Sequence, residues 1–126
     1  MKDFYVASTN KTPEIKFQAK RGELIIAGRS VPENSTQFYR PVYQWLDHYI
    51  HRPAHKTTLK VNLEYFNTSS SKCLVDIFRK LEQVQAIGRL VQIVWHYEKD
   101  DEDMLESGED FQEIIKVPIH MKAVKG

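Results

Sequence analysis

The chain has 126 residues, of which 41% are hydrophobic and 28% are charged, and its formal net charge is +1. This is the composition of an ordinary globular protein, so we expect a single domain over residues 1–126 and, with so little net charge, no nucleic-acid partner. Cys73 is the only cysteine, which excludes an intrachain disulfide, and no apolar run approaches the roughly 20 residues that span a bilayer, so we expect a cytoplasmic protein without membrane insertion.

Two strands joined by a short turn are predicted near the N-terminus. The segment EIKFQAK, residues 14–20, places Ile15 and Phe17 on one side. The apolar segment ELIIAGR, residues 23–29, follows after Arg21-Gly22. Strand-forming residues on both sides of a glycine-containing turn are typical of a β-hairpin.

An amphipathic helix is predicted next, because apolar side chains recur at spacings of three and four residues. They are Phe38, Val42, Trp45, Leu46, Tyr49 and Ile50. Either Asn34 or Ser35 caps the start of this helix, whereas Pro41 suits a first turn and would mark where the regular helix begins. We expect Trp45 to lie in the core.

A strand and a second helix are predicted in the middle of the chain. Residues 57–66 alternate between apolar and polar side chains, as a half-buried strand does. The side chains expected to face inward are Leu59, Val61, Leu63 and Tyr65. From Ser70 the apolar residues follow a helical period, and the pattern ends near Gly88, which predicts the second helix.

The C-terminal part is predicted to continue this alternation. LVQIVWHY, residues 90–97, is typical of a strand with neighbours on both sides. The acidic stretch 98–115 indicates a loop and a third helix, and residues 116–124 form either a final strand or an irregular tail. Strands that alternate with helices imply right-handed crossovers. We therefore predict an α/β fold with a mixed β-sheet, helices packed mainly on one face, and the other face partly open.

Four hydroxyl residues stand together where the second helix begins. They are Thr68, Ser69, Ser70 and Ser71. The first N–H groups of a helix lack partners, and a single capping side chain contributes about 0.5 to 2 kcal/mol. The same place favours a phosphate, because free N–H groups and the helix dipole attract an anion and Lys72 lies in the first turn. A helix cap and a phosphorylation site are thus alternatives here.

Three segments resemble, in the same order, the SiaC-type regulatory phosphoproteins of bacteria, a family whose fold is similar to that of the STAS anti-sigma-factor antagonists. The segments are GRSVPENSTQFYRPVYQWLDHYI, LEYFNTSSSKCLVDIFRKLE and VWHYEKDDEDMLESGEDF, and the resemblance extends over roughly residues 12–120. It implies a single-domain, STAS-like regulator with three partners. These are a diguanylate cyclase that the unphosphorylated form activates, an anti-sigma-type serine/threonine kinase and a PP2C-type phosphatase.

The resemblance also implies which residues act. The threonine of the family's NTSS segment is reversibly phosphorylated, and it maps onto Thr68. When the D-S-S-G stretch of STAS antagonists is aligned without gaps, its phosphorylated serine falls on Ser69. Ser69 is therefore the second candidate for the phosphorylated residue, after Thr68. The residues expected to bind partners are Glu33, Asn34, Asn67, Thr68, Ser69, Ser70 and Lys72. The first two also fit an ordinary turn and cap.

We predict no catalytic residue, no metal and no cofactor, because the chain has no glycine-rich phosphate loop, nucleophile elbow or metal-ligand signature. His48, His51 and His55 have helical spacing, but Pro53 interrupts the helix that would align them. We expect Cys73 to be a small buried apolar residue. The alternative function is that of an anti-sigma-factor antagonist or a stressosome-like partner-switching scaffold.

Overall fold

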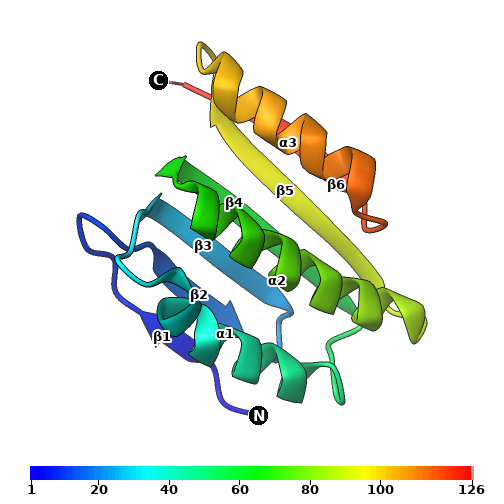
Figure 1. Cartoon of the computed structure of the whole chain (residues 1–126). Coiled ribbons are helices and arrows are strands. Elements are labelled where there is room, and N and C mark those ends of the chain that lie inside the picture. The colour runs from blue at the N-terminus through cyan, green and yellow to red at the C-terminus, as the bar shows by residue number, and fades with distance from the viewer. Residues whose placement is uncertain (126) are drawn as a thin grey trace.

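The fold is built on one six-stranded sheet (Figure 1). The computed structural model describes residues 1–125. The strands lie in chain order: β1 (Phe4–Val6), β2 (Glu14–Gln18), β3 (Glu23–Ser30), β4 (Lys56–Phe66), β5 (Leu90–Glu98) and β6 (Ile119–Val124). The pairs β1–β2 and β2–β3 are antiparallel, whereas β3 to β6 run parallel to one another. The predicted mixed α/β sheet is confirmed.

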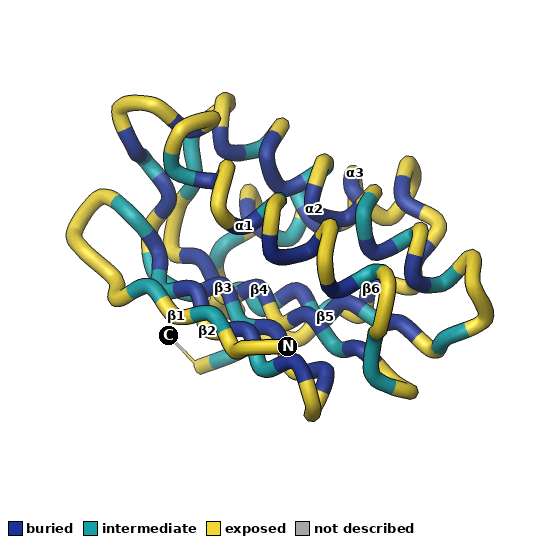
Figure 2. Tube along the Cα trace, turned by 90° about the horizontal axis from the view of Figure 1, so that it is seen from below, coloured by how far each residue is buried: buried dark blue, intermediate teal, exposed yellow. Residues whose placement is uncertain are grey.

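Three helices connect the parallel strands: α1 (Ser35–Tyr49), α2 (Thr68–Ala86) and α3 (Glu102–Ile114). All three lie on the same face of the sheet, as Figure 2 shows. Crossovers of one hand between neighbouring parallel strands place each helix on that side. The predicted arrangement of the helices is therefore confirmed, and the opposite face of the sheet carries none of them. Within residues 1–125, no helix combines the length and the apolar character needed to cross a membrane.

The core lies between the sheet and the three helices. Trp95 of β5 is fully buried and meets Phe111 of α3 edge-on, with ring centroids 5.3 Å apart. Trp45 of α1 is buried as predicted and stacks on Tyr49 at a centroid distance of 4.9 Å. Cys73 is also buried, as expected. Removal of such apolar surface from water is the main favourable term that holds helices on a sheet.

The predicted position of Pro41 in the first turn of a regular helix is wrong. The helix α1 begins at Ser35 with Asn34 as its N-cap, and Pro41 lies inside it. An internal proline deprives the carbonyl four residues earlier, that of Gln37, of its usual N–H donor. Both Gln37 and Pro41 are exposed, so water can reach that carbonyl and the helix continues.

The predicted inward orientation of Tyr65 is also wrong, because its side chain is 52% exposed. Beyond Leu63 the pairing of β4 with β3 shifts by one residue, and Glu64 has no partner on β3. This β-bulge inverts the alternation of side chains that the sequence pattern indicated. Phe66 points to the core in place of Tyr65, and its ring centroid lies 5.8 Å from that of Trp95.

The other predicted elements are confirmed: the hairpin of β2 and β3, the helix α2, the strand β5 and the helix α3. The last segment is a strand rather than an irregular tail. The strand β1 was not predicted. It has only 3 residues, and its extended conformation is stabilised by pairing with the edge of β2.

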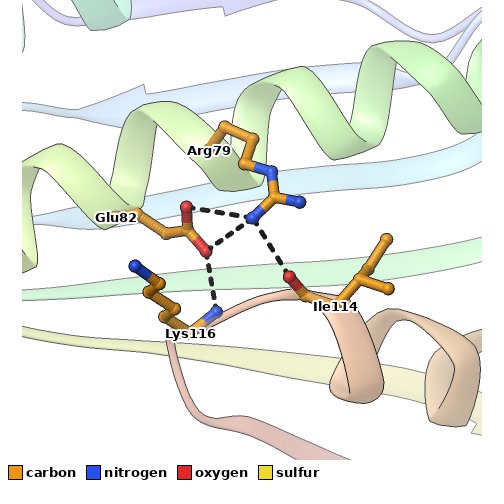
Figure 3. Close-up of polar contacts among 4 residues, drawn as sticks. All are labelled: Arg79, Glu82, Ile114 and Lys116. Atoms are coloured by element: carbon orange, nitrogen blue, oxygen red, sulfur yellow. Dashed lines mark hydrogen bonds and ion pairs between the residues drawn. The ribbon is translucent and has the colours of Figure 1, made fainter.

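A small polar cluster fastens the end of α3 to α2 (Figure 3). Arg79 of α2 donates a hydrogen bond to the carbonyl of Ile114 at 3.0 Å and forms an ion pair with Glu82 at 3.2 Å. Glu82 in turn accepts a hydrogen bond from the backbone N–H of Lys116 at 2.7 Å. Carbonyl groups at the end of a helix have no partner within it, so the arginine satisfies one of them.

Candidate functional site

The candidate site lies where α1 and α2 begin next to each other. The strands β3 and β4 are parallel neighbours, so the helices that follow them start at the same edge of the sheet (Figure 1). Asn34 caps α1 by accepting a hydrogen bond from the N–H of Gln37 at 3.0 Å. Asn67 caps α2 by accepting one from the N–H of Ser70 at 2.9 Å. Both caps are asparagine side chains, so the hydroxyl run is not needed for capping.

Ser70 belongs to a buried hydroxyl network. Its hydroxyl donates to the carbonyl of Ser30 at 3.0 Å and accepts from the hydroxyl of Ser30 at 2.8 Å. The hydroxyls of Ser30 and Tyr39 lie 2.6 Å apart. Burial raises the pKa of Tyr39 to about 12, although the hydrogen bond to Ser30 acts in the opposite direction. The phenol therefore keeps its proton at neutral pH. Ser70, which we predicted on the partner-binding surface, lies beneath that surface with no exposed area.

Ser69 is exposed, but its hydroxyl is held by two neighbours. It lies 2.7 Å from the hydroxyl of Ser35 and donates a hydrogen bond to the side-chain oxygen of Asn67 at 3.2 Å. The contact with Ser35 joins the N-terminus of α2 to that of α1. Phosphorylation of Ser69 would remove the hydroxyl proton and with it the bond donated to Asn67.

Thr68 is the first residue of α2 and is exposed. In the part of the chain that the structure describes, its hydroxyl has no hydrogen-bond partner, and neither do the backbone N–H groups of Thr68 and Ser69. Free N–H groups at a helix N-terminus favour an anion. A phosphoryl group on Thr68 would thus leave every hydrogen bond of the site in place.

The charges near the site are sparse. Glu33 lies just before α1 and Lys72 one turn into α2, and both side chains are exposed. Neither α1 nor α2 has an acidic residue in its first turn, whereas α3 begins with Glu102 and Asp103. The positive ends of the α1 and α2 dipoles are therefore not balanced by carboxylates of their own first turns.

The sequence did not identify Ser30 and Tyr39 as members of the site, and it suggested Ser35 only as a possible cap. These residues reach Ser69 and Ser70 through the pairing of β3 with β4 and the packing of α1 beside α2. A serine at the end of a buried strand, as Ser30 is, was the one available signal. His48 belongs to the last turn of α1, and His51 and His55 follow that helix, at the end opposite to the candidate site. Within residues 1–125, no group of three His, Cys, Asp or Glu residues is placed to share a metal ion.

Comparison with known proteins finds one family and relatives that match nearly the whole chain. Residues 6–124 match the family described as SiaC family regulatory phosphoprotein. An uncharacterised protein of Pseudomonas aeruginosa strain UCBPP-PA14 is 33% identical over 123 residues, which cover 98% of each chain.

Two solved structures from Pseudomonas aeruginosa are similar over almost the whole chain. In the crystal structure of apo-SiaC, the match has 33% identity and a TM-score of 0.88, and it covers 98% of this chain and 100% of that one. In the crystal structure of the diguanylate cyclase SiaD in complex with its activator SiaC, the matching chain has 32% identity and a TM-score of 0.90, with 97% of this chain and 100% of that one covered.

Proposed function

The chain belongs to the SiaC family of regulatory phosphoproteins, and we propose that its unmodified form binds and activates a diguanylate cyclase. The support is the near-complete similarity to a complex in which SiaC is the activator of the cyclase SiaD. An activator of this kind needs no catalytic residue, so we assign synthesis of cyclic di-GMP to the cyclase and no reaction to this chain. We place the complex in the cytoplasm, the reducing compartment that a free cysteine favours.

Reversible phosphorylation of Thr68 is the proposed switch, with an anti-sigma-type serine/threonine kinase adding the phosphoryl group and a PP2C-type phosphatase removing it. The observation that supports Thr68 over Ser69 is that its exposed hydroxyl has no hydrogen-bond partner among the described residues, whereas the hydroxyl of Ser69 contacts Ser35 and Asn67. A kinase can modify Thr68 without breaking the contacts that join α1 to α2.

The binding surface that we propose surrounds Thr68. It comprises the exposed or half-buried residues at the two helix starts, which are Glu33, Asn34, Asn67, Ser69 and Lys72. Ser70 supports this surface from below through its bonds to Ser30. Because the two N-termini are joined by the Ser35–Ser69 contact, they would meet a partner as one rigid unit.

The effect of the phosphoryl group follows from its charge. A phosphothreonine carries about −1.5 to −2 charges at neutral pH and a strongly bound hydration shell. If the cyclase covers Thr68, that charge is left in the interface without a matching cation, which costs several kcal/mol. A loss of about 2.8 kcal/mol corresponds to a hundredfold weaker complex.

The test is a cyclase assay with three variants. Wild type, Thr68→Ala and Ser69→Ala are expected to stimulate cyclic di-GMP synthesis by the purified cyclase, whereas Thr68→Asp stimulates it weakly because of its negative charge. After incubation with the kinase and ATP, wild type and Ser69→Ala should lose stimulation, and Thr68→Ala should retain it.

Ser69→Ala tests the second candidate for the phosphorylated residue. Because this substitution also removes the Ser35–Ser69 contact, its stimulation before kinase treatment is the reference for its stimulation afterwards. Intact mass and peptide mapping must accompany the activities, since an aspartate supplies only part of the charge of a phosphate. The proposed switch is wrong if the kinase phosphorylates Thr68→Ala but does not phosphorylate Ser69→Ala. The proposed activity is wrong if the unmodified protein neither binds nor stimulates the cyclase.

A further inference from the structure

The face of the sheet opposite the helices, which lies below them in Figure 2, is open. A row of residues in register crosses all six strands on this face. The strand registers place in this row Tyr5, Lys16, Ile25, Lys60, Val94 and His120. Each of these residues is one position away, along its strand, from residues that face the helices. The row therefore lies on the helix-free face throughout.

Lysines and aliphatic side chains alternate along this row from β2 to β5, in the order Lys16, Ile25, Lys60 and Val94. Ile25 is half-buried between Lys16 and Lys60, and Val94 is half-buried between Lys60 and His120. No acidic residue belongs to the row. The aliphatic groups offer apolar contact, and Lys16 and Lys60 beside them offer positive charge, which together fit a partner that presents both apolar and acidic groups.

A second row adds positive charge on the β5–β6 side of the face. His96 of β5 pairs with Lys122 of β6, on the same face as Lys60 and Val94. Burial lowers the pKa of His96, and the nearby charges of Lys122 and Lys60 lower it further. The Nε2 atom of His96 is buried and has no hydrogen-bond partner within residues 1–125. The lowered pKa keeps the imidazole neutral at neutral pH, so Lys122 carries the positive charge of this second row.

The cations of this face are not neutralised within the described chain. Lys16, Lys60 and Lys122 take part in no ion pair among residues 1–125. On the β1–β3 side, Glu14 accepts a hydrogen bond from the hydroxyl of Tyr5 at 3.3 Å and Glu23 lies 3.9 Å from Arg21. On the β5–β6 side, Glu98 is exposed and forms no ion pair among residues 1–125. A negative partner would thus find the lysines available.

We propose that the helix-free face, defined by Lys16, Ile25, Lys60, Val94 and Lys122, binds an acidic amphipathic helix of a partner protein. From β2 to β6 the row spans about 19 Å, at about 4.8 Å between strands. A helix of about 13 residues has this length at 1.5 Å per residue. Its apolar stripe would contact Ile25 and Val94, and carboxylates beside the stripe would meet the lysines.

This contact is separate from the site at Thr68, which lies at the start of a helix on the other side of the sheet. A partner could therefore engage this face whether or not Thr68 is modified. The partners available for a test come from the proposed function: the diguanylate cyclase, the kinase and the phosphatase.

The experiment compares the binding of these three purified proteins to wild type and to the double variant Lys60→Glu/Lys122→Glu. The control is Lys11→Glu/Lys20→Glu, which changes the net charge equally at two exposed loop positions. At low salt, at least one partner should bind Lys60→Glu/Lys122→Glu at least tenfold more weakly than it binds wild type, and should bind the control as tightly as wild type. The affinity of that partner for wild type should fall as the salt concentration rises.

Methyl NMR spectra of the complex locate the contact. The methyl signals of Ile25 and Val94 should shift on binding, and those of Ile26, fully buried against the helices, should not. The inference is overturned if all three partners bind the double variant as tightly as wild type. It is equally overturned if the only binding that depends on Lys60 and Lys122 is to phosphatidylglycerol vesicles or to a second copy of this chain. If the wild type fails to bind the cyclase, the proposed function fails, and the kinase and phosphatase still decide the inference.

Discussion

Removal of the cap of α2 tests how the structure holds Thr68 in place. In Asn67→Ala, the N–H of Ser70 loses an acceptor at 2.9 Å and the hydroxyl of Ser69 loses one at 3.2 Å. The loss of an N-cap costs about 1 kcal/mol, within a range of about 0.5 to 2. Unfolding entropy of about 2.1 cal/mol/K per residue gives about 265 cal/mol/K for this chain, so 1 kcal/mol corresponds to a fall of about 4 °C in Tm.

The assay is thermal unfolding followed by circular dichroism, with urea unfolding as a second measure of the free energy. Asn67→Asp is the matched control, because its carboxylate keeps the acceptor and adds a negative charge at the positive end of the helix. Its Tm should equal or exceed that of wild type. A Tm of Asn67→Ala within 1 °C of wild type, or an equal loss in both variants, would refute the role given to this cap.

Three further variants test other parts of the structure. Phe111→Ala removes a ring that packs against three aromatic side chains, so the free energy of unfolding should fall by about 3 to 5 kcal/mol in urea titrations; a loss under 1 kcal/mol would contradict this packing. Gly22→Ala should lower it by more than about 1 kcal/mol, because φ is +66° and a Cβ would lie 2.2 Å from the carbonyl oxygen of Lys56; an unchanged midpoint would count against that geometry. The pKa of His96 is lowered by burial and by nearby lysines, so below about pH 6.5 the unfolded state binds more protons than the folded state and the free energy of unfolding should fall as pH drops. His96→Asn should show a flatter dependence of this free energy on pH between pH 7 and 5. Parallel curves for wild type and variant would contradict the assigned cause.

The main elements of the fold could be predicted from the sequence because each has a clear period. The alternation in 57–66 and the stripe from Leu74 to Val84 are local patterns that tertiary packing reinforces. The position of Tyr65 could not be predicted, because a β-bulge depends on the register with β3 and leaves no mark in the sequence of β4. The start of α1 was mispredicted from Pro41, because the preference of proline for a first turn is outweighed by burial of the side chains around it.

The junction of β4 and α2 could be located from the sequence, but the separate tasks of its hydroxyls could not. Ser70 is buried because α1 and β3 bring Tyr39 and Ser30 to it, and both lie far away along the chain. Ser69 is held because Ser35 opens the neighbouring helix. Thr68 differs from both only in having no such neighbour, which three-dimensional packing alone decides.

The central claim is that a phosphoryl group on Thr68 separates this protein from the cyclase. The most direct measurement is isothermal titration of the cyclase with the unmodified protein and with protein stoichiometrically phosphorylated at Thr68, verified by mass. We predict that phosphorylation weakens the complex at least a hundredfold, or about 2.8 kcal/mol. Dissociation constants that agree within threefold would contradict the account.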